Sequence, residues 1–255
     1  MKILNVQYSN LTVPEVLVRI FDFLKKGERG RVCFLNFECL RQATSNETYR
    51  HTLDSADLVL SDGVGLKLTT RLFGGGMRDN CNGTDLSPLI IEKAVEFGYK
   101  IFLLGGGERV AEMAAENLRH RMPGIKIVGT YHGYFDDDEQ VINKINDSGT
   151  DILFVGMGVP KQEIWIARNQ QHFRPLVCLG VGALLDYLSG VIPRAPRWMR
   201  RCGLEWLWRI FFDPKRLIRR YLIDGTCFAA FLIYSRVRYG LSGTSGPLRA
   251  RSSVE

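Results

Sequence analysis

The 255-residue sequence predicts an α/β fold: a doubly wound, mainly parallel, Rossmann-like sheet followed by a basic, aromatic-rich helical appendage at the C-terminus. Strand-like apolar runs alternate with segments of helical spacing, which is typical of a parallel sheet with helices on both faces. Most of these runs end at glycines. Near residue 193 the composition changes to Arg, Trp and Pro, which marks the start of the appendage.

Five segments are expected to form strands, and each contains a continuous rather than an alternating apolar run, as in strands buried on both faces. They are 31–36, 56–65, 100–107, 151–158 and 175–182. Ligands bind beyond the carboxyl ends of such strands, where backbone N–H groups can hold phosphate. The glycines expected there as candidate binding residues are Gly63, Gly65, Gly105, Gly156 and Gly158.

Three helices are expected between these strands. In 87–98, Ser87 is a plausible N-cap and Gly98 follows the last turn. The segment 108–124 has apolar residues at helical spacing and stops at Pro-Gly. The segment 160–173 begins with Pro160 at the expected first helical position.

The net charge is concentrated in one segment. Nine of the 34 Lys and Arg but only two of the 27 acids lie in 194–221, so this segment accounts for the whole net charge of +7. We therefore divide the chain into an α/β domain (1–193), a basic appendage expected to meet an anionic partner (194–240), and a disordered tail (241–255).

The appendage fits three kinds of anionic partner: a nucleic acid, a membrane surface, or a substrate over which it closes. A solvated charged helix would not explain its large aromatic residues, Trp198, Trp206, Trp208, Phe211 and Phe212. Aromatic rings beside arginines favour a membrane interface, and the neutral remainder of the chain disfavours nucleic acid. The longest apolar run, 225–234, is too short to span a bilayer.

Asp62 is a candidate general base because it ends an apolar strand and precedes two glycines. Capping the next helix, or a place in a turn, explains this position equally well. Lys161, Gln162 and Glu163 open a helix directly after a glycine turn, so we expect all three side chains at the mouth of the ligand cleft.

Several other chemistries are not supported. No glycine run completes the GxGxxG fingerprint, no P-loop motif occurs, and the four histidines show no ligand spacing. Asp136 and Asp138 form a DxD pair, but these acids open an expected helix and complement its dipole. We therefore predict neither a metal site nor a cofactor. Scattered cysteines and no signal-peptide pattern indicate a cytoplasmic protein.

Taken together, the motifs resemble the WecG/TagA/CpsF glycosyltransferases, glycosyltransferase family 26. The resemblance covers roughly 1–222. It is carried by the ordered motifs LSDGVG (60–65), NGTDL (82–86), VGTYHGYF (128–135), DILFVGMGVPKQEIW (151–165), GVGALLDYLSG (180–190), RAPRWMRRCGLEWLWR (194–209) and DPKRLIRRY (213–221).

The resemblance implies an inverting, metal-independent transferase that moves a sugar from a UDP-sugar to a sugar on a polyprenyl diphosphate. Such enzymes work at the inner face of the cell membrane in surface polysaccharide biosynthesis, and some relatives form homo-oligomers. By resemblance Asp62 is the base, and Asn36 and Gln162 bind substrate. The arginines implied to reach the diphosphate are Arg194, Arg216, Arg219 and Arg220.

Two departures from the family pattern bear on the donor sugar. Phe34 stands where many relatives have Thr, and Asn80 stands where many have Arg, shortly before the motif that contains Asp85. Asn80 and Asp85 are also candidate substrate contacts. The donor is therefore N-acetylmannosamine-like or a hexose such as glucose. The alternative function is a non-catalytic nucleotide-binding or nucleic-acid-binding α/β protein.

Overall fold

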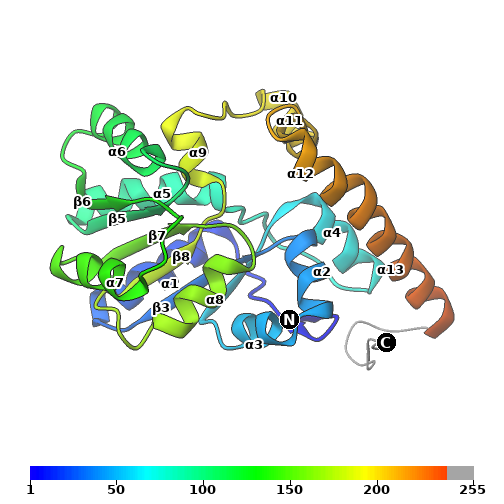
Figure 1. Ribbon diagram of the computed structural model, residues 1–255. Helices are drawn as coiled ribbons and strands as arrows, with labels where there is room; N and C mark the ends of the chain where they lie inside the picture. The colour runs from blue at the N-terminus through cyan, green and yellow to red at the C-terminus, as the bar shows by residue number, and fades with distance from the viewer. Residues whose placement is uncertain (240–255) are drawn as a thin grey trace.

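The computed structural model describes residues 1–239 and confirms the α/β prediction. Its main sheet has six strands, all parallel, in the order β4-β3-β8-β7-β5-β6 (Figure 1). The strands are β3 (Gly30–Leu35), β4 (Leu58–Ser61), β5 (Lys100–Gly105), β6 (Lys126–Tyr131), β7 (Ile152–Gly156) and β8 (Val177–Gly180).

Helices cover both faces of the sheet because successive side chains of each strand point to opposite sides. Val32 and Phe34 pack into one core, whereas Cys33 and Leu35 pack into another. The first core is covered by α1 (Val13–Lys26), α5 (Gly83–Phe97), α6 (Val110–Arg121) and α9 (Leu184–Ser189). The opposite face is covered by α2 (Phe37–Ser45), α3 (Glu47–Asp54), α4 (Gly63–Leu72), α7 (Asp138–Asp147) and α8 (Lys161–Asn169).

Two strand predictions need correction. The segment expected as a strand at 56–65 contributes only the four residues of β4, because Asp62 ends it and α4 begins at Gly63. The strand β6 was not expected from the sequence. It pairs only with β5 at the edge of the sheet and is half-exposed over most of its length, so it lacks a continuous apolar run. A short antiparallel hairpin joins β1 (Lys2–Ile3) to β2 (Val6–Gln7).

Helix α5 begins earlier than expected, because Asn82 caps it by accepting a hydrogen bond from the backbone of Asp85. Ser87 is therefore a buried residue inside the helix and not its cap. Pro88 has no N–H to donate to the carbonyl of Thr84 four residues earlier. That carbonyl instead accepts a hydrogen bond of 2.9 Å from the guanidinium of Arg194. Helix α8 likewise differs from expectation, since Pro160 precedes it at the cap.

Five helical segments follow residue 193: α10 (Arg197–Arg201), α11 (Glu205–Ile210), α12 (Pro214–Ile218), the π-helical turn η1 (Arg219–Asp224) and α13 (Gly225–Tyr239). In Figure 1 the last three run as one long helix beside α4. Phe228 and Leu232 of α13 are buried in the core that α2 and α4 share, and the rings of Phe228 and Phe37 lie 5.1 Å apart.

Whether these helices form a separate unit stays a prediction, and the expected disordered tail at 241–255 lies outside the described residues. Among residues 1–239, no helix combines the length and the apolar character needed to cross a bilayer.

The carboxyl ends of β5 and β7 approach each other closely. From β5 the chain continues to β6, and from β7 it continues to β8 on the other side, so the strand order reverses between them. A crevice is expected at such a point. Gly105 has a φ of 140°, and a Cβ there would overlap the backbone of Gly156.

We expect Gly105→Ala to lower the free energy of unfolding by about 2 kcal/mol or more, because alanine is strained at this φ and meets the neighbouring strand. Gly107→Ala is the matched control, since the nearest atom to its Cβ would be 3.9 Å away. Urea unfolding of both variants measures the difference. Equal stability of the two would show that β5 and β7 can separate without cost.

Candidate active site

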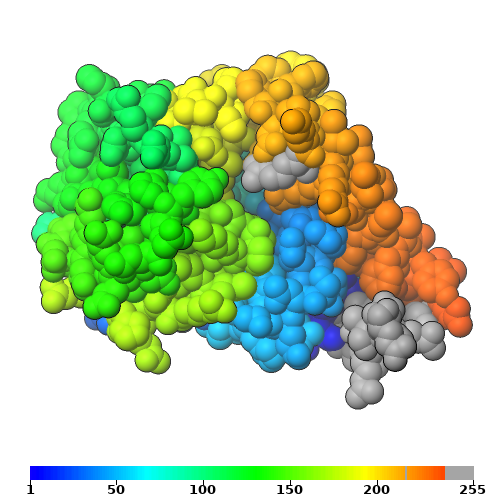
Figure 2. Space-filling model, viewed as in Figure 1, coloured from blue at the N-terminus to red at the C-terminus, as the bar shows by residue number. Residues whose placement is uncertain are grey.

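A large cleft opens at the carboxyl edge of the sheet. Its volume is about 1390 Å³, and it extends from the glycine turns after β5, β7 and β8 to the helices α10–α13. Figure 2 shows this face hollowed where the green part of the chain, the blue helix α2 and the orange C-terminal helices meet. The cleft exceeds the usual size of a site for one small ligand, so it has room for two substrates.

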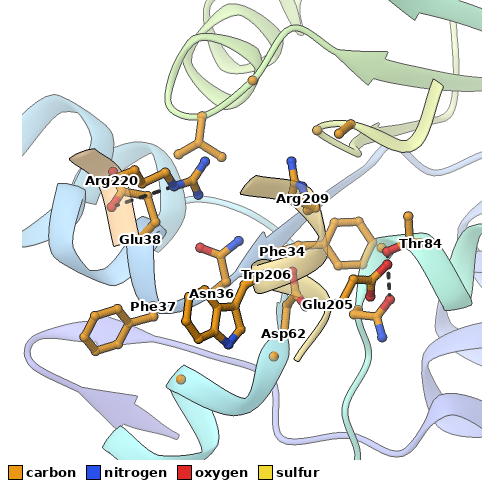
Figure 3. A pocket seen from close by; sticks show the side chains of 18 of the residues that line it. Phe34, Asn36, Phe37, Glu38, Asp62, Thr84, Glu205, Trp206, Arg209 and Arg220 are labelled. Carbon is orange, nitrogen blue, oxygen red and sulfur yellow. Dashed lines mark hydrogen bonds and ion pairs between the residues drawn. The ribbon is translucent and has the colours of Figure 1, made fainter. Parts of the chain in front are cut away.

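Asp62 and Asn36 lie side by side in the middle of the cleft (Figure 3). They follow β4 and β3, whose last residues Ser61 and Leu35 are paired in register, so both side chains emerge at one edge. The Asn36 oxygen caps α2 by accepting a hydrogen bond of 3.0 Å from the Cys39 backbone. This cap orients the Asn36 amide group, whose side chain is hydrogen-bonded to Asp62.

Asp62 occupies the N-cap position of α4, yet its side chain makes no capping hydrogen bond. The structure thus favours a cleft-facing carboxylate over a helix cap. Burial raises the pKa of Asp62 to about 6, although the hydrogen bond from Asn36 and the charge of Arg209 oppose this rise. A carboxyl with such a pKa is largely ionised at neutral pH and is a stronger base than an ordinary aspartate.

Asn80 shapes the turn that follows Asp62. Its side-chain oxygen accepts a hydrogen bond of 2.7 Å from the backbone of Gly63, whose φ of 86° is in the left-handed region that glycine favours. Residues 79–81 are in turn tied to β4, because Cys81 donates to the carbonyl of Ser61 at 2.9 Å. Asn80 therefore lines the cleft and also fixes the backbone next to Asp62.

Asp85, Arg194, Arg200 and Glu205 form a charged clamp between α5 and the C-terminal helices. Arg194 lies 2.8 Å from Asp85 and 3.1 Å from Glu205, and Arg200 lies 3.5 Å from Asp85. Burial alone would raise the pKa of Asp85, but hydrogen bonds from Asn82 and Arg194 and the charges of both arginines lower it overall. The clamp holds α10 and α11 over the cleft.

Gln162 connects two glycine turns at the cleft floor. Its side-chain oxygen accepts hydrogen bonds from the backbone N–H groups of Gly158 (3.1 Å) and Gly182 (3.0 Å). Its amide nitrogen donates to Glu163 at 2.7 Å. Glu163 is fully buried, and burial raises its pKa to about 7. Glu163 thus fixes which way the amide of Gln162 points.

Arginines from the C-terminal helices complete the cleft. Arg209 of α11 and Arg220 of η1 both line it (Figure 3). Burial would lower the pKa of Arg209, but the nearby phenols of Tyr221 and Tyr187 and the acids Glu205 and Asp62 raise it overall. Arg220 lies 4.0 Å from Glu38, which is held by two hydrogen bonds from Arg41 of the same helix.

Comparison with known proteins assigns the chain to a family. The sequence profile of the Glycosyl transferase WecG/TagA/CpsF family matches residues 1–241. The chain belongs to this family.

Among its relatives, a Bacillus spizizenii protein is 32% identical over 194 residues, which is 76% of each chain. A Staphylococcus aureus protein is 31% identical over 220 residues, 85% of this chain and 86% of the relative. Both are named N-acetylglucosaminyldiphosphoundecaprenol N-acetyl-beta-D-mannosaminyltransferase.

The cleft of this WecG/TagA/CpsF family member brings together most of the residues expected from the sequence. Those that line it are Asn36, Asp62, Gly63, Gly65, Asn80, Asp85, Gly156, Gly158, Lys161, Gln162 and Arg220. Their individual roles stay predictions. Phe34, the departure noted beside Asn36, also lines the cleft and packs against Gly83.

Four expected contacts do not line the cleft. Gly105 serves the packing of β5 on β7, and the adjacent Gly106 and Gly107 line the cleft instead. Glu163 was expected at the mouth but lies beneath the floor. Arg194 is engaged in the clamp, and Arg219 is exposed elsewhere. The side chain of Arg216 lies outside the described part of the structure.

Sequence reasoning missed Arg200, Glu205, Arg209 and Tyr187, all of which line the cleft. Tyr187 has a buried hydroxyl without a hydrogen-bond partner. The family motif at 194–209 contains three of these residues and was the available signal. Of the DxD pair, Asp138 lies in the first turn of α7 and accepts a hydrogen bond of 2.7 Å from Trp165, while the intervening Asp137 caps the helix.

We expect Glu163→Leu to reduce transfer about tenfold or more, because the amide of Gln162 loses the acceptor that orients it. Glu163→Gln keeps an acceptor of the same shape and is neutral, like the protonated acid, so its activity should stay within a few-fold of wild type. Steady-state kinetics with thermal unfolding as a folding control compares the two. Equal loss in both variants would show that Glu163 acts through its charge.

Proposed function

We propose that this protein transfers a hexose or N-acetylhexosamine from a UDP-sugar to a sugar on a polyprenyl diphosphate, in surface polysaccharide biosynthesis. The observation that carries the proposal is Asp62, a carboxyl of raised pKa held by Asn36 in a cleft with room for two substrates. Two relatives whose names specify such a sugar transfer support the acceptor class.

The donor diphosphate binds at the crevice between β5 and β7. Gly106, Gly107, Gly156 and Gly158 line the cleft there, where backbone N–H groups can reach a phosphate. Helices α4, α5, α8 and α9 all begin at this edge, so their positive ends point toward the same region. Tyr134, exposed at the rim, offers a ring on which the uracil can stack.

The reaction is a single displacement that inverts the anomeric carbon. The acceptor oxygen bonds to this carbon, the bond from the carbon to the UDP oxygen breaks, and Asp62 takes the acceptor's proton. Backbone N–H groups and helix ends stabilise the charge on leaving UDP, so no metal is required.

The acceptor diphosphate binds near Asp62, between Arg209 and Arg220, which line the same cleft. Both arginines come from helices that cross the cleft, and a planar guanidinium matches phosphate oxygens. Tyr187 offers its unpaired hydroxyl to the sugar. The donor sugar is N-acetylmannosamine-like or glucose-like. Phe34 and Asn80, which differ from the residues of many relatives, both line the cleft and can contact this sugar.

We propose that the helices after residue 193 also bind the protein peripherally to the inner face of the membrane. Large apolar side chains are exposed there, among them Phe211 (75% exposed), Trp198 (62%) and Ile223 (56%). Arg197, Arg201 and Arg219 accompany them, so this surface matches anionic headgroups as well as acyl chains.

The test of the proposed reaction is a panel of UDP-sugars with a synthetic N-acetylglucosaminyl polyprenyl diphosphate, read by product mass. We expect one donor to add one sugar and release UDP. Asp62→Asn should reduce the rate on the order of a hundredfold or more, because the amide cannot accept the proton. Near-normal transfer by Asp62→Asn would reject its role as base.

In the same assay, the plot of kcat/KM against pH should fall on its acid side. The base must be deprotonated, so kcat/KM is expected to fall as pH drops through about 6, the pKa of Asp62. Asn36→Ala removes a hydrogen bond that lowers this pKa, and the fall should then move to higher pH. A fall that stays in place would show that another group controls it.

Membrane binding is tested by sedimentation with vesicles that contain anionic phospholipid. Changing Trp198 and Phe211 to serine should weaken binding on the order of tenfold, because both rings lose apolar contact. Val18→Ser, on α1 and also exposed, is the control. Unchanged binding by the double variant would place the membrane contact elsewhere.

A further inference from the structure

The cleft does not end at Asp62 but continues between α4 and α13. On α4 its wall is formed by Val64, Leu68 and Leu72. These residues are spaced by four, so they form a stripe along one face of the helix. The stripe is about 12 Å long at 1.5 Å per residue.

The facing wall on α13 has the same character. Ala229, Leu232 and Ile233 line the cleft at helical spacing. The residues of α4 and α13 that line the cleft include no charged side chain. Thr69 and Thr226 are the hydroxyl residues among them. Thr69 donates its hydroxyl to the Gly65 carbonyl within α4, and Thr226 donates to carbonyls of the preceding turn η1. A sugar or nucleotide would find few polar partners here.

Contacts at both ends of α4 fix its position. Near the site, the turn between α10 and α11 packs on Val64, since a Cβ at Gly203 would lie 3.1 Å from the Val64 Cβ. At the far end, Arg236 of α13 donates a hydrogen bond of 3.1 Å to the carbonyl of Leu72. Between these points Leu68 is 59% exposed and Ile233 is 57% exposed, although both line the cleft. The groove is therefore apolar and uncovered.

We infer that this groove binds the first isoprene units of the acceptor's polyprenyl chain, an inference that rests on the proposed function. The argument is continuity. The same cleft contains Asp62, the arginines Arg209 and Arg220, and the groove. Arg220 lies five residues before α13, so a diphosphate held there places the attached chain at the start of the groove.

The chain offers a matched pair of variants. Ile233 and Ile223 are 57% and 56% exposed and lie on the same long helix, but only Ile233 lines the cleft. Leu68→Glu, on α4, tests the opposite wall. All three side chains are exposed, so a glutamate should not disturb folding, which thermal unfolding checks.

Transfer is measured in solution, without vesicles, to N-acetylglucosamine diphosphates esterified with methyl, geranyl or farnesyl groups. For the wild type we expect KM to fall as the chain lengthens, by up to about fourfold for each further methylene buried. Ile233→Glu and Leu68→Glu should raise KM for the farnesyl acceptor tenfold or more and leave the methyl acceptor unchanged. Ile223→Glu should behave as wild type.

Three results would overturn the inference: a wild-type KM that ignores chain length, groove variants that match Ile223→Glu, or a chain effect seen only with vesicles. The last would assign the chain to the membrane surface. If the protein transfers sugar to none of these acceptors, the proposed function is rejected, but the groove can still be tested by binding. Quenching of Trp fluorescence by farnesyl diphosphate, weakened by Ile233→Glu but not by Ile223→Glu, would still decide the groove.

Discussion

The close approach of three glycine turns at one edge of the sheet is the constraint on which the rest of the site depends. A Cβ at Gly105 would overlap Gly156, and a Cβ at Gly156 would lie 2.7 Å from the Gly182 carbonyl. Without side chains these turns meet, and Gln162 ties two of them through a single oxygen. Their backbone N–H groups are then presented to the cleft in fixed positions, which favours anion binding without reorganisation. The buried Glu163 sets the direction of that amide.

Several charged side chains around the cleft form ion pairs with one another. Helices α10 and α11 are clamped to α5 through Asp85, Arg194, Arg200 and Glu205. The clamp follows from a local defect, because Pro88 leaves the Thr84 carbonyl without its helical donor and Arg194 supplies one. Arg194, which the family resemblance predicts to contact a phosphate, thus stabilises the start of α5. Arg209 and Arg220 are better placed to meet a substrate, because both line the cleft.

Much of the fold could be predicted from the sequence, because strands buried on both faces read as continuous apolar runs. The edge strand β6 could not, because half of it is exposed and its pattern is mixed. Asp62 was found because it follows a buried strand directly, whereas Asn36 was found through the family resemblance. Glu163 was misplaced, since position in a first helical turn does not say which side of the turn faces solvent. Arg209 was missed because three short helices and a π-helical turn break the periodicity that would have related it to the cleft.

The geometry of α13 suits an acceptor that is anionic at one end and apolar along the rest. Such a molecule cannot lie wholly in the polar cleft, because its apolar chain needs a second environment. It cannot lie wholly in the bilayer either, because the proposed mechanism requires its sugar to reach Asp62. A helix with two apolar faces can contact the chain in both places, in the groove with one face and in the bilayer with the other. One face, with Leu232 and Ile233, borders the groove that opens from the catalytic cleft. Elsewhere on the same long helix, Ile223 and Val237 are exposed away from the cleft. On the proposed function, the chain would pass from the membrane to the active site beside α13, and the groove would shield part of it from water.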